Sequence, residues 1–212
     1  MFPVFLDLTG RRVVVVGGGP VGRRKALAAR DAGAAVVVVD PEAPVAHAPG
    51  SPEVIHIREP YRPEHLAGAC LVFAAATPEV NARVVADARA AGIRVNSATD
   101  PQSGDCLLPA VVRRGGLTLA VGTGGASPAL ARRIREKLKA EFDDAFAAWV
   151  RLLDEVRPVV LATVPDPARR RELLDALADW PWLERLRAEG AEATRAAMRD
   201  TIEASRGRER PE

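Results

Sequence analysis

The chain has 212 residues, 48% of them hydrophobic, which is enough for one large domain or two small ones with a real core. Its 30 basic and 28 acidic side chains nearly cancel, so charge gives no argument for a nucleic-acid or membrane partner. The two cysteines are far apart, no apolar run approaches ~18 residues, and the first residues lack a basic start. We therefore expect no disulfide framework, structural zinc site, transmembrane helix or signal peptide, and a cytoplasmic location.

The first elements form a dinucleotide-binding fingerprint. An apolar run of strand length at 12–16 leads into a glycine turn at 17–22 with the spacing G-x-G-x-x-G. A helical stretch at 23–31 follows, and then a second apolar run at 35–39 that ends in Asp40. Strand, glycine turn, helix, strand and acid together predict a Rossmann-type pyrophosphate site.

Each residue of this pattern has a distinct expected role. Gly17 permits the tight turn, Gly19 lets the backbone approach a pyrophosphate, and Gly22 lets the helix pack close to the strand. The N-terminus of the helix then presents free N–H groups to the phosphates. Asp40 is placed to accept hydrogen bonds from a ribose diol and to repel a 2′-phosphate, which favours NAD over NADP. The alternative is a glycine-rich turn that only allows close packing.

The chain continues to alternate between strand and helix patterns. Strands are expected at 54–57, 70–75 and 93–96, with one helical turn at 63–66 and a helix at 79–91 that Thr77 caps. This alternation predicts an α/β fold with a parallel, doubly wound sheet. Ligands of such a sheet bind at the carboxyl ends of its strands, here near Gly17, Asp40, Thr77 and Asn96.

The pattern changes near residue 107. Strands at 107–112 and 117–121, joined by Arg113-Arg114-Gly115-Gly116, predict a hairpin. In the glycine loop that follows at 122–128, Ser127 is a good N-cap and Pro128 takes the first position of a long basic helix. From 141 onward we expect only helices, one starting at Asp166-Pro167 and the last spanning roughly 183–204, before a charged tail at 206–212.

A second constellation joins the loop after Asn96 to the glycine loop at 122–128. The glycine loop opens a helix and so offers a second anion site made of backbone N–H groups. Arg113, Arg114, Arg132 and Arg133 stand nearby in the sequence. The alternative is ordinary hairpin and cap chemistry, with the arginines as a solvated face. No Ser-His-Asp set is present, and the three histidines share no metal-ligand spacing, so we expect no metal site.

At these residues the chain resembles the precorrin-2 dehydrogenase family, which includes the N-terminal module of siroheme synthases. The resemblance covers about two-thirds of the chain, from the start to near Leu138, and the Gly-Gly-Ala-Ser-Pro loop is its most specific part. The segments that carry it are Phe2–Leu8, Gly10-Arg11, Val15–Lys25, Ala75–Thr77, Asn81, Val95-Asn96, Leu108–Arg113, Leu117–Val121 and Thr123–Ala131.

The resemblance implies an NAD-dependent oxidation of precorrin-2 to sirohydrochlorin, and in some members the insertion of ferrous iron to give siroheme. It also implies a homodimer whose middle segment interdigitates with its partner. The substrate is a tetrapyrrole with several carboxylates, which suits an arginine-rich pocket. The chemistry needs little from side chains, because positioning supplies much of the rate and one group assists proton removal.

One position departs from the family pattern. An Asp-Asp-Pro-like sequence typically follows the strand ending near Asn96, and its first acid is the one assigned to catalysis. Here that position is Thr99, and only Asp100 is acidic. Thr99 cannot act as a base near neutral pH, so either Asp100 takes the role or binding geometry and water suffice. Chelation must shed two pyrrole protons, so we expect ferrochelatase activity to be weak or absent.

These inferences lead to a division into four segments and a set of site residues. We expect an NAD-binding Rossmann domain at 1–106, a dimerisation and tetrapyrrole-binding segment at 107–140, a helical domain at 141–205 and a disordered tail at 206–212. Rival hypotheses are an NAD-sensing regulatory module without catalysis, a bifunctional dehydrogenase and ferrochelatase, and a chelatase that works without NAD. The expected site residues are Gly17, Gly19, Pro20, Val21, Gly22, Asp40, Pro41, Thr77 and Asn96 for NAD, Thr123, Gly124, Gly125, Ser127, Arg113 and Arg132 for the tetrapyrrole, and Asp100 as the base.

Overall fold

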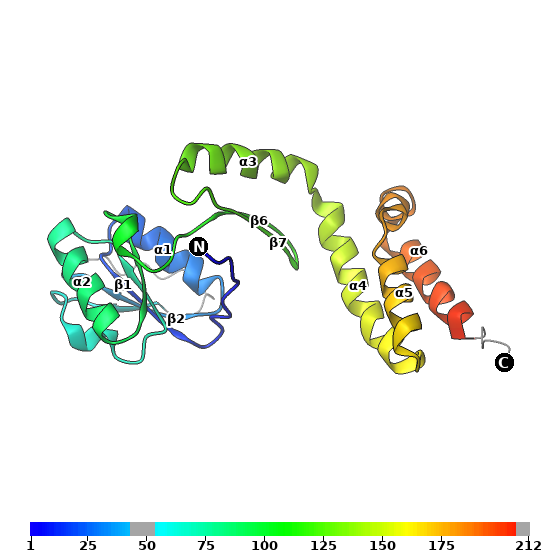
Figure 1. Cartoon of the computed structure of the whole chain (residues 1–212), viewed down its shortest axis with the longest axis horizontal. Coiled ribbons are helices and arrows are strands. Elements are labelled where there is room, and N and C mark those ends of the chain that lie inside the picture. The colour runs from blue at the N-terminus through cyan, green and yellow to red at the C-terminus, as the bar shows by residue number, and fades with distance from the viewer. Residues whose placement is uncertain (43–53, 207–212) are drawn as a thin grey trace. The chain divides into compact units, whose positions relative to one another are not determined.

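The computed structural model describes residues 1–42 and 54–206 (Figure 1). They form two compact units, Met1–Leu108 and Pro109–Glu212. The boundary lies two residues beyond the domain end expected at 106, and the finer divisions expected at 140 and 205 stay predictions. Apart from Arg206, which ends the last helix, the expected tail lies outside the described residues.

The first unit is built on a five-stranded parallel sheet with the order β3-β2-β1-β4-β5. Its strands are β1 (Arg12–Val16), β2 (Ala35–Val39), β3 (Ile55–Ile57), β4 (Leu71–Ala74) and β5 (Arg94–Ser97). The helices are α1 (Pro20–Arg30) and α2 (Pro78–Ala90), with short 3-10 helices at Pro63–Leu66 and Pro101–Ser103. The strand order reverses between β1 and β4, which is where ligands of doubly wound sheets bind.

Alternation along the strands sends successive side chains to opposite faces of the sheet. Val14, Val72 and Val95 pack on one face with Val84 and Ala88 of α2. The residues between them along the strands face the other side and pack with Ala26 and Ala29 of α1. These strand residues are Val13, Val15, Val36, Val38, Leu71 and Phe73. The sheet is therefore covered on both faces, which confirms the predicted α/β class (Figure 1).

The predicted elements of this unit are found with small shifts, apart from one helix. That helix, expected at 23–31, begins at Pro20 because Gly19 takes the extended N-cap conformation and proline fits the first helical position. Residues 20–22 of the predicted glycine turn therefore belong to the first turn of α1. Thr77 caps α2 as expected, its Oγ1 accepting from the Val80 N–H at 3.4 Å.

The second unit holds a hairpin of β6 (Ala110–Arg114) and β7 (Leu117–Val121) and four helices. The helices are α3 (Pro128–Glu141), α4 (Asp144–Thr163), α5 (Pro167–Leu177) and α6 (Trp180–Arg206). Most of its core lies among the last three helices, where Leu152, Leu177 and Met198 are fully buried. Ser127 and Asp166 cap α3 and α5 through their side chains, as expected.

Two expectations for this unit were wrong. The strand expected at 107–112 lies at 110–114, because only Gly115 and Gly116 form the turn; Arg114 pairs with Leu117, and Gly115 has φ +55°. The last helix begins at Trp180 instead of 183, and Gly190 interrupts it with φ 83° and ψ 173°. None of the helices in the described ranges is long and apolar enough to cross a membrane.

Candidate functional site

Two glycines of the turn after β1 are required by the fold itself. Gly17 has φ +106°, and a Cβ there would overlap the backbone of Ala75 after β4. A Cβ on Gly22 would overlap the carbonyl oxygen of Gly17, because the first turn of α1 lies directly against the turn. Both positions therefore need glycine before any ligand is considered.

Gly19 is different, because nothing in the protein demands glycine there. Its backbone is extended, at φ −65° and ψ −177°, and a Cβ would meet no protein atom within 4 Å. The space beside it is open at the N-terminus of α1. Gly19 is the N-cap of this helix, so no side chain caps its first N–H groups, and the first turn carries no acid. An open space facing free N–H groups at the positive end of a helix fits a pyrophosphate.

Asp40 follows β2 directly and ties the glycine turn to that strand. Its Oδ2 accepts from the Gly18 N–H at 2.5 Å, and its Oδ1 accepts from the Glu42 N–H at 2.7 Å. A carboxylate oxygen accepts more than one hydrogen bond, so both oxygens keep capacity for a ribose diol. Pro20, Val21 and Pro41, also predicted as contacts, are exposed around these groups.

The loops after β4 and β5 meet at the same edge of the sheet. Asn81, in the first turn of α2, is 1% exposed. Its Oδ1 accepts from the Ala76 N–H at 2.8 Å, and its Nδ2 donates to Thr99 Oγ1 at 3.1 Å. The position of the family acid is thus held by a buried amide, which the sequence analysis quoted only as part of the resemblance.

Asp100, the candidate base, is exposed and caps the short 3-10 helix at 101–103. Its Oδ1 accepts from the Gln102 N–H at 3.1 Å, and its own N–H donates to Ser97 Oγ at 3.2 Å. The other carboxylate oxygen makes no hydrogen bond among the described residues. Asp100 can therefore accept a proton at that oxygen without leaving its place.

Asn96, predicted at the nicotinamide side, belongs to a buried polar cluster. It is 4% exposed, its Oδ1 accepts from Lys25 Nζ at 2.5 Å, and its Nδ2 donates to the Cys106 carbonyl at 2.8 Å. Lys25 was not among the residues predicted for the site. Helical spacing would have found it, because Lys25 shares the sheet-facing side of α1 with Gly22, Ala26 and Ala29.

The glycine loop of the second unit is closed upon itself. Thr123 Oγ1 accepts from the Ser127 N–H and donates to the Ser127 carbonyl, both at 3.1 Å. Gly124 and Gly125 adopt φ +62° and +90°, and the Ala126 N–H donates to the Thr123 carbonyl. Since the Thr123 side chain is engaged in the loop and the Ser127 side chain caps α3, a ligand here would be met by the backbone of Gly124 and Gly125.

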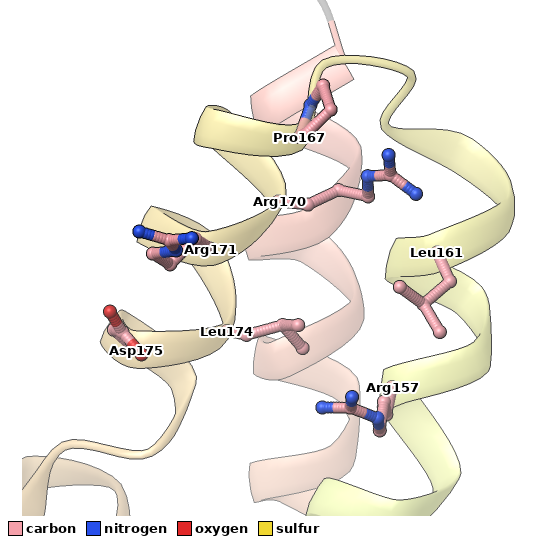
Figure 2. A pocket seen from close by; sticks show the side chains of 7 residues that line it. All are labelled: Arg157, Leu161, Pro167, Arg170, Arg171, Leu174 and Asp175. Carbon is pink, nitrogen blue, oxygen red and sulfur yellow. The ribbon is translucent and has the colours of Figure 1, made fainter.

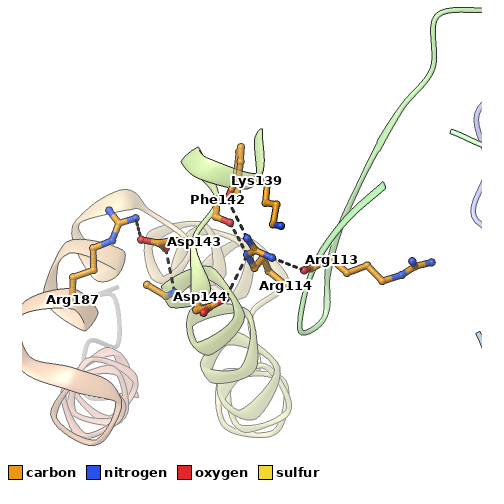
Figure 3. A network of polar contacts seen from close by, with 8 residues as sticks. Arg113, Arg114, Lys139, Phe142, Asp143, Asp144 and Arg187 are labelled. Carbon is orange, nitrogen blue, oxygen red and sulfur yellow. Dashed lines mark hydrogen bonds and ion pairs between the residues drawn. The ribbon is translucent and has the colours of Figure 1, made fainter. Parts of the chain in front are cut away.

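The arginines near this loop differ in what they do. Arg113 and Arg132 are exposed. Arg114 is structural: its guanidinium donates to the Phe142 and Lys139 carbonyls at the end of α3, at 2.9 and 3.1 Å, and lies 3.5 Å from Asp144 (Figure 3). Of the pair in the hairpin, Arg113 is therefore the one available to a ligand.

A shallow pocket lies between α4 and α5 in the second unit, and none of its lining residues is one predicted as a site residue. Arg157 and Arg170 border its apolar floor of Leu161 and Leu174 (Figure 2). Within the described residues no group of three or more His, Cys, Asp or Glu side chains gathers as a metal site would require.

Comparison with known proteins gives two matching family models. Residues 4–110 match the model described as "Putative NAD(P)-binding", and residues 114–141 match "Sirohaem biosynthesis protein central". The first covers the whole sheet and the glycine turn. The second covers the end of the hairpin, the glycine loop and α3.

Individual relatives agree with these models. The chain is 37% identical to a siroheme synthase of Chromobacterium violaceum over 96% of its length, and 38% identical to one of Pseudomonas putida over 91%. It spans only 44% and 42% of those proteins. A solved structure titled "SirC, precorrin-2 dehydrogenase" is similar over 96% of this chain and 100% of that one, with 28% identity and a TM-score of 0.73.

Proposed function

Because the chain belongs to the NAD(P)-binding family of the precorrin-2 dehydrogenases and siroheme synthases, we propose that it oxidises precorrin-2 to sirohydrochlorin with NAD. The single observation that carries this proposal is the open space beside Gly19, bordered by the N-terminus of α1 and by Asp40. It supports a bound dinucleotide, and the two family models that match in sequence order support the tetrapyrrole pathway.

NAD is favoured over NADP by the charge at the end of β2. The carboxylate of Asp40 is fixed by two backbone N–H groups, so it cannot swing away to admit a 2′-phosphate. A fixed carboxylate accepts hydrogen bonds from the ribose hydroxyls and repels the phosphate. Gly17, Gly19, Pro20, Val21 and Gly22 would hold the pyrophosphate, and Pro41 would lie beside the adenosine ribose.

The residues of this chain supply binding and one proton acceptor. When bound, the nicotinamide supplies the hydride-accepting chemistry. Thr77 and the end of β5 form the sheet edge where that ring would lie, and Asp100 on the same edge has a carboxylate oxygen free to take the proton. Thr99 has no acid-base capacity near neutral pH, and its hydroxyl oxygen accepts a hydrogen bond from the Asn81 amide.

The tetrapyrrole side is proposed to come from the second unit. The backbone of the loop Thr123, Gly124, Gly125 and Ser127 would meet the carboxylates of the ring, together with Arg113 and Arg132. We also propose a homodimer whose middle segment interdigitates with its partner, as the resemblance to the family implies. Its support here is that α3 buries only Ala131 in the single chain, which leaves Leu130 half exposed.

We propose further that ferrochelatase activity is weak or absent. Chelation releases two pyrrole protons, and Thr99 removes one of the two acids that the family places at this loop. Purified protein mixed with sirohydrochlorin and ferrous iron should form siroheme no faster than the uncatalysed mixture. Rapid formation above that rate would overturn this part of the proposal and leave the dehydrogenase in place.

The decisive experiment follows NADH at 340 nm when precorrin-2 and NAD are mixed with the protein. NADH and sirohydrochlorin should appear in equal amounts. A well-folded protein that binds NAD without oxidising precorrin-2 would instead indicate a cofactor-sensing module. If the protein binds neither NAD nor NADH in a calorimetric titration, both the dehydrogenase and the cofactor-sensing hypotheses are refuted.

A further inference from the structure

Lys25 places an ammonium group inside the first unit, where charge is costly. The side chain is 8% exposed, and its Nζ lies 5.1 Å from the centroid of the Phe73 ring. None of the ion pairs found in the described part of the chain includes it. Burial lowers the pKa of Lys25, and repulsion from Arg24 lowers it further. A methionine of similar size would fill this space at lower cost.

The hydrogen bond that this ammonium donates, the one found for it among the described residues, fixes the orientation of Asn96. An ammonium only donates and a backbone carbonyl only accepts, so the two partners distinguish the ends of the amide. With Lys25 donating to Oδ1, Nδ2 must face the Cys106 carbonyl, to which it donates at 2.8 Å. If the amide turned over, Nδ2 would face the ammonium and Oδ1 would face a carbonyl.

The bond to Cys106 closes the loop that carries the candidate base. The chain leaves β5 at Ser97, passes Thr99 and Asp100, and returns so that the Asp105 N–H donates to the Val95 carbonyl at 2.8 Å. Gly104 fits the return, since a Cβ there would lie 2.8 Å from the Val95 carbonyl oxygen. Lys25, on α1, thus acts on a loop more than 70 residues later through one buried amide.

We propose that Lys25 is a positioning residue whose ammonium orients the Asn96 amide and so holds the loop 97–106, with Asp100, at the sheet edge. The inference rests on the proposed function, because the loop matters for catalysis only if Asp100 or its neighbours serve the reaction. The charge stays buried because it gives the Asn96 amide a single orientation. Displacement of the proton acceptor would lower the rate of the reaction far more than it would weaken substrate binding.

The test compares Lys25→Met with Arg24→Met, which removes the same charge from an exposed neighbour on the same helix. Amide hydrogen exchange reports the order of the loop directly. Lys25→Met should accelerate exchange at the Asp105 and Ser103 amides, while the core amides of β1 keep their protection. With precorrin-2 and NAD, kcat should fall about tenfold or more while KM changes little, as expected for misplaced catalytic groups. Arg24→Met should resemble the wild type in both readouts.

A second variant separates the two bonds of the amide. Asn96→Asp keeps an acceptor for Lys25 but places a carboxylate oxygen against the Cys106 carbonyl, so the loop should loosen although Lys25 stays paired. If both variants leave exchange in the loop and kcat unchanged, the inference is overturned and the proposed function stands. If the wild type fails to oxidise precorrin-2 while Lys25→Met still loosens the loop, the proposed function fails. The role of Lys25 in holding the loop 97–106 through Asn96 then remains.

Discussion

Replacing Asp40 with asparagine should change which dinucleotide the protein prefers. In the wild type, the Gly18 and Glu42 N–H groups hold the Asp40 carboxylate, and the proposed binding mode brings the 2′-position of the ribose beside it. At about 5 Å and an effective dielectric constant of about 20, two unit charges repel by about 3 kcal/mol. Removing the charge should therefore lower the ratio of the dissociation constants for NADP and NAD by about a hundredfold.

The substitution also weakens the site itself. Asparagine has one carbonyl oxygen for two backbone donors, so one N–H group loses its acceptor, at a cost of about 1–3 kcal/mol in unfolding free energy. Isothermal titration with NAD and NADP measures the ratio, and thermal unfolding measures the stability. Asp31→Asn is the matched control, because it removes an exposed carboxylate paired with Arg30 at the end of α1. An unchanged ratio in Asp40→Asn would refute the assignment of Asp40 to the ribose.

Four further outcomes are expected. Gly19→Ala should keep the melting temperature and lose NAD affinity in calorimetry, whereas Gly22→Ala should lose both, since only Gly22 is required by the fold. Leu177→Ala should lower the unfolding free energy in urea by about 2–5 kcal/mol, because the side chain is fully buried. The native state holds the Lys25 proton less tightly than the unfolded chain, so its burial opposes folding at neutral pH. The stability of the wild type in urea should therefore rise relative to Lys25→Met as the pH increases toward the ordinary lysine pKa of about 10.4, and a constant difference would refute this. Thr99→Asp should raise siroheme formation above the uncatalysed rate.

The sequence predicted the first unit well because its signals are local. The strands at 12–16 and 35–39 have the bounds expected from their valine runs, and the cap at Thr77 follows from a side chain that bonds its own helix, as the cap at Ser127 does in the second unit. The hairpin was misplaced because Arg113 and Arg114 read as turn residues. Arg114 is drawn into the strand by its bonds to the distant end of α3, which no local pattern reveals.

The candidate site was predicted in position more than in detail. Strand ends of a parallel sheet converge, so Gly17, Asp40, Thr77 and Asp100 could be assigned to one edge from topology alone. What each side chain does there depends on partners far along the chain. Asn96 was predicted near the nicotinamide because it lies at the end of a strand, and that stays a prediction; its bond to a lysine 71 residues earlier is a contact that no local pattern reveals.

The turn after β1 shows how a fold requirement and a ligand requirement can be separated within one motif. Gly17 is required by its positive φ and by the nearby backbone of Ala75, and Gly22 by the close approach of α1 to the turn, so their presence argues for packing alone. Gly19 satisfies no steric need of the chain. Its backbone angles suit any residue, yet it faces open space at the end of a helix with no acid in its first turn. Gly19 and the Asp40 carboxylate beside the turn are therefore the features that favour a bound pyrophosphate, and a Cβ at Gly19 tests this without disturbing the fold.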